Sequence, residues 1–188
     1  MASECIYCGS TNVVSTADHA AFCRDCRRSD ALGGDAATAG EDPDRVGVVG
    51  LGYVGSSLSA VFADHGLTVR GVDVDERILD LVADGECPIE EAEITERFER
   101  HATAGRITAT DSYDALDDCE TIVVTVGTPL AAADPDLSAV EAATRSIGPH
   151  VDAGDLVVFR STLPAGATED TIRPILDETT GLTAGTDY

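Results

Sequence analysis

Three glycines in the first half of the chain have the spacing of a phosphate-binding turn. Gly50, Gly52 and Gly55 form the pattern G-x-G-x-x-G and follow a short valine-rich run, residues 46–49. Where such a triplet joins a strand to a helix, the first glycine makes a tight turn, the second lets the backbone approach a pyrophosphate, and the third lets the helix pack on the strand. Amide groups at the helix N-terminus then face the phosphates. A purely structural glycine turn would give the same pattern, so the triplet needs support from its neighbours.

A carboxylate supplies that support. Leu67, Val69 and Val72 predict a second strand that ends at Asp73, 18 residues beyond Gly55. A carboxylate at this position can accept both hydroxyls of an adenosine ribose, and it repels a 2′-phosphate. The order of strand, glycines, helix and Asp73 therefore predicts a dinucleotide site that favours NAD over NADP.

Four cysteines near the N-terminus form a second constellation. Cys5, Cys8, Cys23 and Cys26 have the spacing C-x2-C, fourteen residues, C-x2-C, which is close to that of a tetrathiolate zinc site. The residues between the pairs can form a short hairpin, and a module this small needs the metal for its folding energy. Redox-active or unmetallated thiols are the alternative. His19 lies between the pairs and could replace one thiolate, but a solvent-facing histidine is the favoured interpretation. Disulfides are disfavoured in a cytosolic protein.

The role of this module is open. Arg24, Arg27 and Arg28 give it a basic edge that could dock a protein partner, a nucleic acid or another copy of the chain. A zinc-stapled appendage that only stabilises the N-terminus is the simpler interpretation.

The pattern of the whole chain predicts three parts. Residues 1–28 form the zinc-ribbon-like module, residues 29–44 a flexible acidic linker of small polar residues, and residues 45–188 an α/β Rossmann domain with a doubly wound parallel sheet. Beyond Asp73, apolar periodicity predicts strands at 107–109, 121–126 and 156–159, and helices at 75–84, 89–105, 111–117, 137–147 and 168–179. We expect Asp111 to cap the short helix and Pro174 to kink or restart the last one.

The charge of the chain limits its partners. All 12 basic residues are arginine, against 35 acidic residues, and the net charge is -23. Such a surface repels nucleic acid. Acidity without lysine favours a halophilic cytosol, where salt screens self-repulsion, over an ordinary acidic protein.

The N-terminus lacks a signal-peptide pattern and no apolar stretch could span a membrane, so we expect a cytoplasmic protein.

With these pieces together, residues 45–188 resemble the NAD-binding N-terminal domain of the UDP-glucose/GDP-mannose dehydrogenase family, the nucleotide-sugar 6-dehydrogenases. The resemblance is carried by five motifs in the family's order: VGVVGLGYVG (46–55), GVDVD (71–75), GECPIEE (85–91), VTVGTPL (124–130) and RSTLPAGATE (160–169). The zinc-like module lies outside the family pattern.

The resemblance implies particular cofactor contacts. They are Tyr53 and Val54 in the glycine turn, Asp73 on the ribose, Thr128 after the fourth strand of the Rossmann domain and Thr162 near the reacting centre. Where the family commonly has a basic residue five positions after the ribose carboxylate, this chain has Ile78. The adjacent Arg77 is a candidate substitute.

The resemblance also implies a chemistry. Family members oxidise the sugar C6 alcohol to a carboxylate in two NAD-dependent steps, through a thioester on a cysteine. That cysteine and its lysine, asparagine and aspartate helpers fall in family positions beyond Tyr188, so no catalytic residue is assigned here. Cys87 and Cys119 match no nucleophile position and are expected to be packing residues.

Two functions follow as hypotheses. The first is the NAD-binding part of a nucleotide-sugar dehydrogenase, truncated before the central and C-terminal domains, which binds NAD without turnover by itself and meets its nucleotide sugar only with the missing domains. The second is a regulator that senses NAD and binds a protein partner through the zinc module.

Overall fold

The computed structural model describes residues 13–16, 19–23, 44–131 and 134–188, and the chain divides into two compact units, Met1–Asp42 and Pro43–Tyr188. In the first unit, strands β1 (Val13–Thr16) and β2 (His19–Cys23) pair antiparallel. This pairing confirms the hairpin expected between the two cysteine pairs. Cys5, Cys8 and Cys26 lie outside the described residues.

The second unit is built on a five-stranded parallel sheet in the order β5-β4-β3-β6-β9. Its members are β3 (Arg45–Val49), β4 (Thr68–Val72), β5 (Ile107–Thr110), β6 (Thr121–Val124) and β9 (Leu156–Phe159). Within this unit the chain enters the middle strand, β3, continues through β4 to the edge strand β5, and then crosses to β6 and β9 on the other side of β3. This order is that of a Rossmann sheet and confirms the predicted doubly wound fold.

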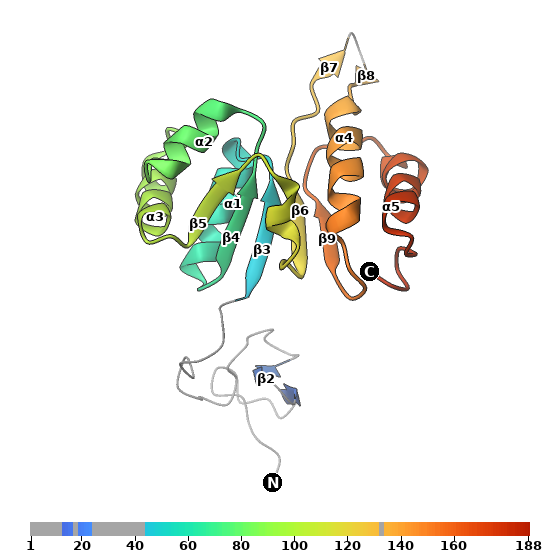
Figure 1. Cartoon of the computed structure of the whole chain (residues 1–188), viewed down its shortest axis with the longest axis horizontal. Coiled ribbons are helices and arrows are strands. Elements are labelled where there is room, and N and C mark those ends of the chain that lie inside the picture. The colour runs from blue at the N-terminus through green and yellow to red at the C-terminus, as the bar shows by residue number, and fades with distance from the viewer. Residues whose placement is uncertain (1–12, 17–18, 24–43, 132–133) are drawn as a thin grey trace. The chain divides into compact units, whose positions relative to one another are not determined.

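Helices cover both faces of the sheet (Figure 1). One layer contains α1 (Tyr53–Asp64), α2 (Glu76–Ala83) and α3 (Ala92–Thr103), and the other contains α4 (Ser138–Ile147) and α5 (Arg173–Thr180). Within the described residues, no helix is long and apolar enough to cross a membrane.

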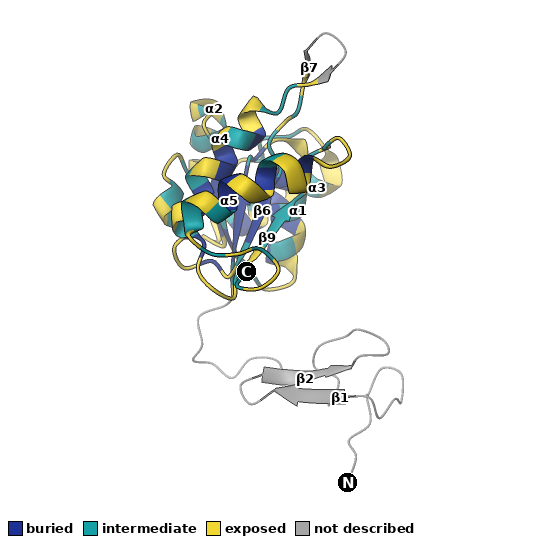
Figure 2. Ribbon diagram, turned by 90° about the vertical axis from the view of Figure 1, so that its right-hand side faces the viewer, coloured by how far each residue is buried: buried dark blue, intermediate teal, exposed yellow. Residues whose placement is uncertain are grey.

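Alternating side chains of each strand supply two separate cores. Val48 packs in a cluster with Ala60 of α1 and Phe98 of α3, whereas its neighbour Val49 packs in a cluster with Val140 of α4. Successive residues of a strand point to opposite faces, so the valine-rich run of β3 contributes to both. Figure 2 shows the buried residues on the strands and on the inner sides of the helices. This burial on both faces explains why the strand reads as a nearly continuous apolar run.

The segment after β5 differs from the prediction. It is a short 3-10 helix, Tyr113–Leu116, and its cap is Ser112, whose side-chain oxygen accepts the N–H of Asp114. The prediction that Asp111 caps a helix over 111–117 was wrong. Serine and aspartate are equivalent N-cap residues, so the sequence alone does not choose between adjacent positions.

Several other boundaries also shift, most of them by one or two residues. Strand β6 ends at Val124, two residues early, and α3 begins at Ala92 rather than 89 because Glu91 is its extended N-cap. The last helix starts as a π-helical segment, Thr168–Ile172, and continues as α5 from Arg173. Because proline has no backbone N–H, Pro174 cannot donate a helical hydrogen bond. The change from the π-helical segment to α5 next to it agrees with the predicted restart. The short strands β7 (Leu130–Ala131) and β8 (Asp134–Pro135) and a 3-10 turn, Gly148–His150, were not predicted.

Candidate functional site

A crevice of about 470 Å³ lies beyond the carboxyl ends of β3, β4 and β6. This is the edge where the winding of the sheet reverses between β3 and β6, the usual position of a ligand in a doubly wound fold. Its lining is mostly small and apolar, with two carboxylates as the charged members: Gly50, Gly52, Asp73, Val74, Asp75, Ile78, Tyr113, Thr125, Val126, Gly127, Ala139, Ala142 and Ala143.

The three glycines of the turn meet three different requirements. Gly50 has a φ of +91°, which L side chains rarely adopt. A Cβ on Gly55 would lie 1.8 Å from the carbonyl oxygen of Gly50, so only glycine lets the helix approach the strand this closely. A Cβ on Gly52 would meet no atom within 4 Å. The turn therefore needs Gly50 and Gly55 for its own geometry, whereas Gly52 leaves its backbone open toward the crevice.

The N-terminus of α1 faces the site without a side-chain cap. Gly52 is the N-cap residue and contributes no capping side chain, and Tyr53 and Val54, the first two helical residues, are exposed. A buried hydrogen bond holds the turn before them, because the Ser56 hydroxyl donates to the carbonyl oxygen of Leu51 at 2.7 Å. The first amides of a helix have no intrahelical acceptor. Together with the helix dipole they form an anion-binding end.

Asp73 is held beside the glycine turn by two backbone groups. Its Oδ2 accepts the N–H of Leu51 at 2.6 Å, and its Oδ1 accepts the N–H of Asp75 at 3.0 Å. A carboxylate has about four acceptor sites. The two backbone bonds orient this carboxylate before any ligand binds. Two acceptor sites remain for hydroxyl groups of a ligand.

Arg77 does not line the crevice, although the sequence made it a candidate contact. Its side chain is 87% exposed and forms a two-pronged ion pair with Asp75, from Nε to Oδ1 at 3.0 Å and from Nη2 to Oδ2 at 2.6 Å. The hydrogen bond from Arg77 lowers the pKa of the Asp75 carboxyl, and the same contact raises the pKa of Arg77. The adjacent Ile78 lines the crevice instead.

Thr128 and Thr162 come together at the same edge of the sheet. The Thr128 hydroxyl donates to the backbone carbonyl of Thr162 at 2.9 Å, and the neighbouring Ser161 hydroxyl donates to the carbonyl of Val126 at 2.7 Å. These two bonds join the loop after β6 to the loop after β9. Neither threonine lines the crevice, but Val126 does.

One wall of the crevice was not found from the sequence. Tyr113 lines it from the 3-10 helix, is half-buried, and has a pKa raised by that burial. Three alanines of α4, at positions 139, 142 and 143, complete the wall. Their spacing of three and four residues places them on one side of the helix. That spacing was available in the sequence, but nothing in it showed which ligand the face would meet.

The two cysteines of the second unit stay outside the crevice. Cys119 is 3% exposed, and burial raises the pKa of its thiol to about 11. Cys87 is partly exposed and also has a raised pKa, mainly from desolvation. A thiol with a raised pKa stays protonated at neutral pH and is a poor nucleophile. The environments of both cysteines therefore agree with the expectation that they are packing residues.

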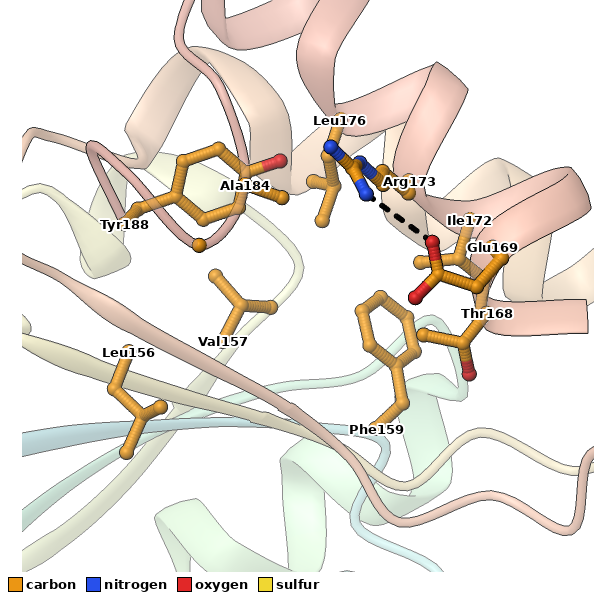
Figure 3. Close-up of a pocket in the computed structure, with 11 residues that line it drawn as sticks. Leu156, Val157, Phe159, Thr168, Glu169, Ile172, Arg173, Leu176, Ala184 and Tyr188 are labelled. Carbon is orange, nitrogen blue, oxygen red and sulfur yellow. Dashed lines mark hydrogen bonds and ion pairs between the residues drawn. The ribbon is translucent and has the colours of Figure 1, made fainter.

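A separate pocket of about 270 Å³ lies between β9 and α5, with an apolar floor (Figure 3). Val157 and Phe159 project into it, and at its rim Arg173 pairs with Glu169 at 3.2 Å and with Asp177 at 3.6 Å. None of the residues predicted to bind the cofactor lines this pocket. Its one cation is already paired twice, so we assign it no part in the dinucleotide site.

The arrangement in the crevice fits a dinucleotide. An uncapped helix end stands beside an open glycine backbone, and a fixed carboxylate stands one strand away. Among the described residues, no group of three or more histidine, cysteine, aspartate or glutamate side chains could hold a metal ion. The uncapped helix end and the fixed carboxylate suit recognition of a phosphate and of ribose hydroxyls, respectively.

Comparison with known proteins decides the family. Residues 44–188 match the model of the UDP-glucose/GDP-mannose dehydrogenase family, NAD binding domain. The chain belongs to this family. The match begins one residue before the predicted start of the Rossmann domain.

Relatives of this NAD-binding domain share about a third of the aligned residues with it. It is 36% identical over 144 residues to UDP-N-acetyl-D-mannosamine dehydrogenase of Pyrococcus horikoshii, covering 77% of this chain and 34% of that protein. It is also 36% identical over 142 residues to UDP-glucose 6-dehydrogenase of Haloferax volcanii, covering 73% of this chain and 33% of that protein. The chain therefore spans about a third of the length of the curated relatives it matches.

Solved structures of the family have the same fold. A ternary complex of GDP-mannose dehydrogenase from Pseudomonas aeruginosa superposes with a TM-score of 0.72 at 31% identity, covering 76% of this chain and 34% of that one. UDP-D-ManNAc dehydrogenase from Pyrococcus horikoshii superposes with a TM-score of 0.72 at 36% identity, covering 76% of this chain and 34% of that one. Residues 44–188 thus have the sequence and the fold of the NAD-binding domain of nucleotide-sugar dehydrogenases.

Proposed function

We propose that the chain binds NAD in the crevice between the glycine turn and α4, and that it is the cofactor-binding part of a nucleotide-sugar 6-dehydrogenase. The observation that carries the proposal is the fixed Asp73 carboxylate beside the open backbone of Gly52. In this arrangement the amides of the α1 N-terminus bind the pyrophosphate, and Asp73 accepts the hydroxyls of the adenosine ribose.

The wider activity is proposed from the relatives. Their names cover oxidation of UDP-N-acetyl-D-mannosamine, UDP-glucose and GDP-mannose, which share an alcohol at the sugar C6. Bound NAD would supply the hydride acceptor for such an oxidation. The residues of this chain would hold and orient the cofactor, while the joined loops carrying Thr128 and Thr162 form the part of the sheet edge beside it.

Calorimetric titration of the full chain with NAD and, separately, with NADP tests the cofactor proposal. The titrations are made in molar salt, which screens the charge of -23. We expect one NAD per chain and weaker binding of NADP. An absence of NAD binding to folded protein would refute the proposal.

We further propose that Cys5, Cys8, Cys23 and Cys26 bind zinc. The pairing of β1 with β2 sets Val13 opposite Cys23, so the hairpin brings the start of β1 beside the end of β2. One C-x2-C pair precedes that start in the sequence, and the other begins at that end. This order of cysteine pair, hairpin and cysteine pair supports a single zinc site that takes two thiolates from each pair.

Metal analysis tests this second proposal. The full chain purified with zinc should contain one zinc per molecule, and C5S and C23S should each lower that content. C87S is the matched control, because Cys87 lies in the other unit, and it should keep the metal. Equal zinc content in all four proteins, or none in the wild type, would contradict the assignment.

A further inference from the structure

The first turn of α2 carries an ion pair at the rim of the crevice. Asp75 lines the crevice and is the N-cap of α2, where its Oδ1 accepts the N–H of Arg77 at 3.0 Å. The same carboxylate takes both prongs of the Arg77 guanidinium. One residue therefore both starts the helix and determines where this guanidinium lies.

The charge balance at this rim disfavours an additional phosphate. The charged residues that line the crevice are Asp73 and Asp75, and the backbone N–H of Asp75 donates to the Oδ1 of Asp73 at 3.0 Å. A 2′-phosphate on the ribose would approach this pair. Enzymes that accept NADP use a guanidinium near this position, and Arg77, two residues farther along, is the candidate in this chain.

We propose that Asp75 determines cofactor specificity, because it holds Arg77 in an ion pair outside the crevice and so withholds a guanidinium from a 2′-phosphate. Asp73 repels the 2′-phosphate directly, whereas Asp75 keeps the Arg77 guanidinium from pairing with that phosphate. The inference rests on the proposed NAD site and adds a second residue to the discrimination against NADP.

Three variants of the full chain separate these effects. D75N removes the ion pair but keeps a side chain that caps helices well. D75N/R77Q also removes the guanidinium, and R77Q removes it alone. The readout is the ratio of the NADP and NAD dissociation constants, measured by calorimetry in one buffer, with thermal melts to confirm folding. D75S is a second capping variant should D75N fold poorly.

We expect D75N to shift the ratio toward NADP by about fivefold, the scale of an exposed ion pair, and D75N/R77Q to lose most of that shift. An unchanged ratio in D75N, or a shift that persists in D75N/R77Q, would overturn the inference. Weaker NAD binding by R77Q alone would also overturn it, since Arg77 would then already contact the cofactor. A wild type that binds neither dinucleotide defeats the proposed function too, whereas NAD binding with an unchanged ratio defeats only this inference.

Discussion

The N–H of Leu51 donates to the Oδ2 of Asp73 across 2.6 Å, and this bond joins the segments that follow β3 and β4 at the edge of the sheet where a dinucleotide would bind. Leu51 lies inside the glycine turn and Asp73 directly follows β4. The bond therefore couples the phosphate-binding turn to the ribose-binding carboxylate, so the two parts of the site keep a fixed separation.

Removing the Asp73 carboxylate should weaken NAD binding. For D73A we expect a loss of about 1 to 3 kcal/mol, the scale of charge-assisted hydrogen bonds, which is roughly 5- to 150-fold in the dissociation constant measured by calorimetry. D80N, a change on the exposed face of α2, is the control and should bind as the wild type does. Unchanged NAD affinity in folded D73A would show that this carboxylate does not contact the cofactor.

Alanine at two glycines of the turn should separate binding from folding. G52A meets no atom within 4 Å, so the protein should fold normally but lose NAD affinity, because the new methyl group occupies the approach to the backbone. G55A places its Cβ 1.8 Å from the carbonyl oxygen of Gly50 and should lower the melting temperature. Melts and calorimetry on both variants test this. A destabilised G52A, or a G55A that melts as the wild type does, would contradict the geometry.

Salt should strengthen the binding of NAD. The charged residues that line the crevice are carboxylates, and the whole chain carries a charge of -23. Raising ionic strength from about 0.1 M to 1 M shortens the screening length from roughly 10 Å to 3 Å and reduces repulsion of the pyrophosphate. Calorimetry across this range, with circular dichroism to confirm folding at each point, should show the dissociation constant fall. A rise with salt would indicate cationic side chains on the phosphates.

Acid should loosen the contact between α1 and α3. Asp64 on α1 accepts a hydrogen bond from His101 on α3 at 2.8 Å, and this bond is the main reason that the pKa of Asp64 is lowered. A carboxyl whose folded pKa lies below its unfolded value stabilises the fold above the unfolded pKa, near 4, and loses that contribution as pH falls through the folded pKa. The melting temperature of the wild type should therefore exceed that of D64N at pH 6, and the difference should shrink toward pH 3. A difference that is constant with pH would exclude this role.

Cys119 should react slowly with alkylating reagents. Its pKa of about 11 leaves roughly one thiol in a thousand ionised at pH 8, and the residue is buried. Mass spectrometry of peptides after iodoacetamide treatment should show Cys87 modified sooner than Cys119, and guanidinium should abolish the difference. Equal rates in the folded chain would mean that Cys119 is accessible.

The sequence was most informative where one local signal settled the structure. Strand β9 was predicted at its observed bounds, because an apolar β-branched run stands between turn residues. The glycine turn and Asp73 were placed correctly because their spacing is dictated by backbone geometry. Helix α4 was predicted to within one residue, since its apolar residues repeat at helical spacing.

The remaining features depend on contacts between distant segments. Tyr113 and Ala142 line the same crevice as Gly50, but only the crossing of the chain from β5 to β6 brings them there. Arg77 was a reasonable candidate by position, yet its partner Asp75 lies two residues away and holds it outward. A local ion pair of this kind has no periodic signature in the sequence.

Hydrogen–deuterium exchange of the full chain, with and without NAD, tests the central claim most directly. The amides at the start of α1, around Tyr53 and Val54, lack intrahelical acceptors and should exchange more slowly when the pyrophosphate binds them. We expect protection of the peptide that spans residues 50–58, together with the peptide that contains Asp73, and no such protection in G52A. Protection confined to the pocket between β9 and α5, or no protection anywhere at saturating NAD, would contradict the proposed site.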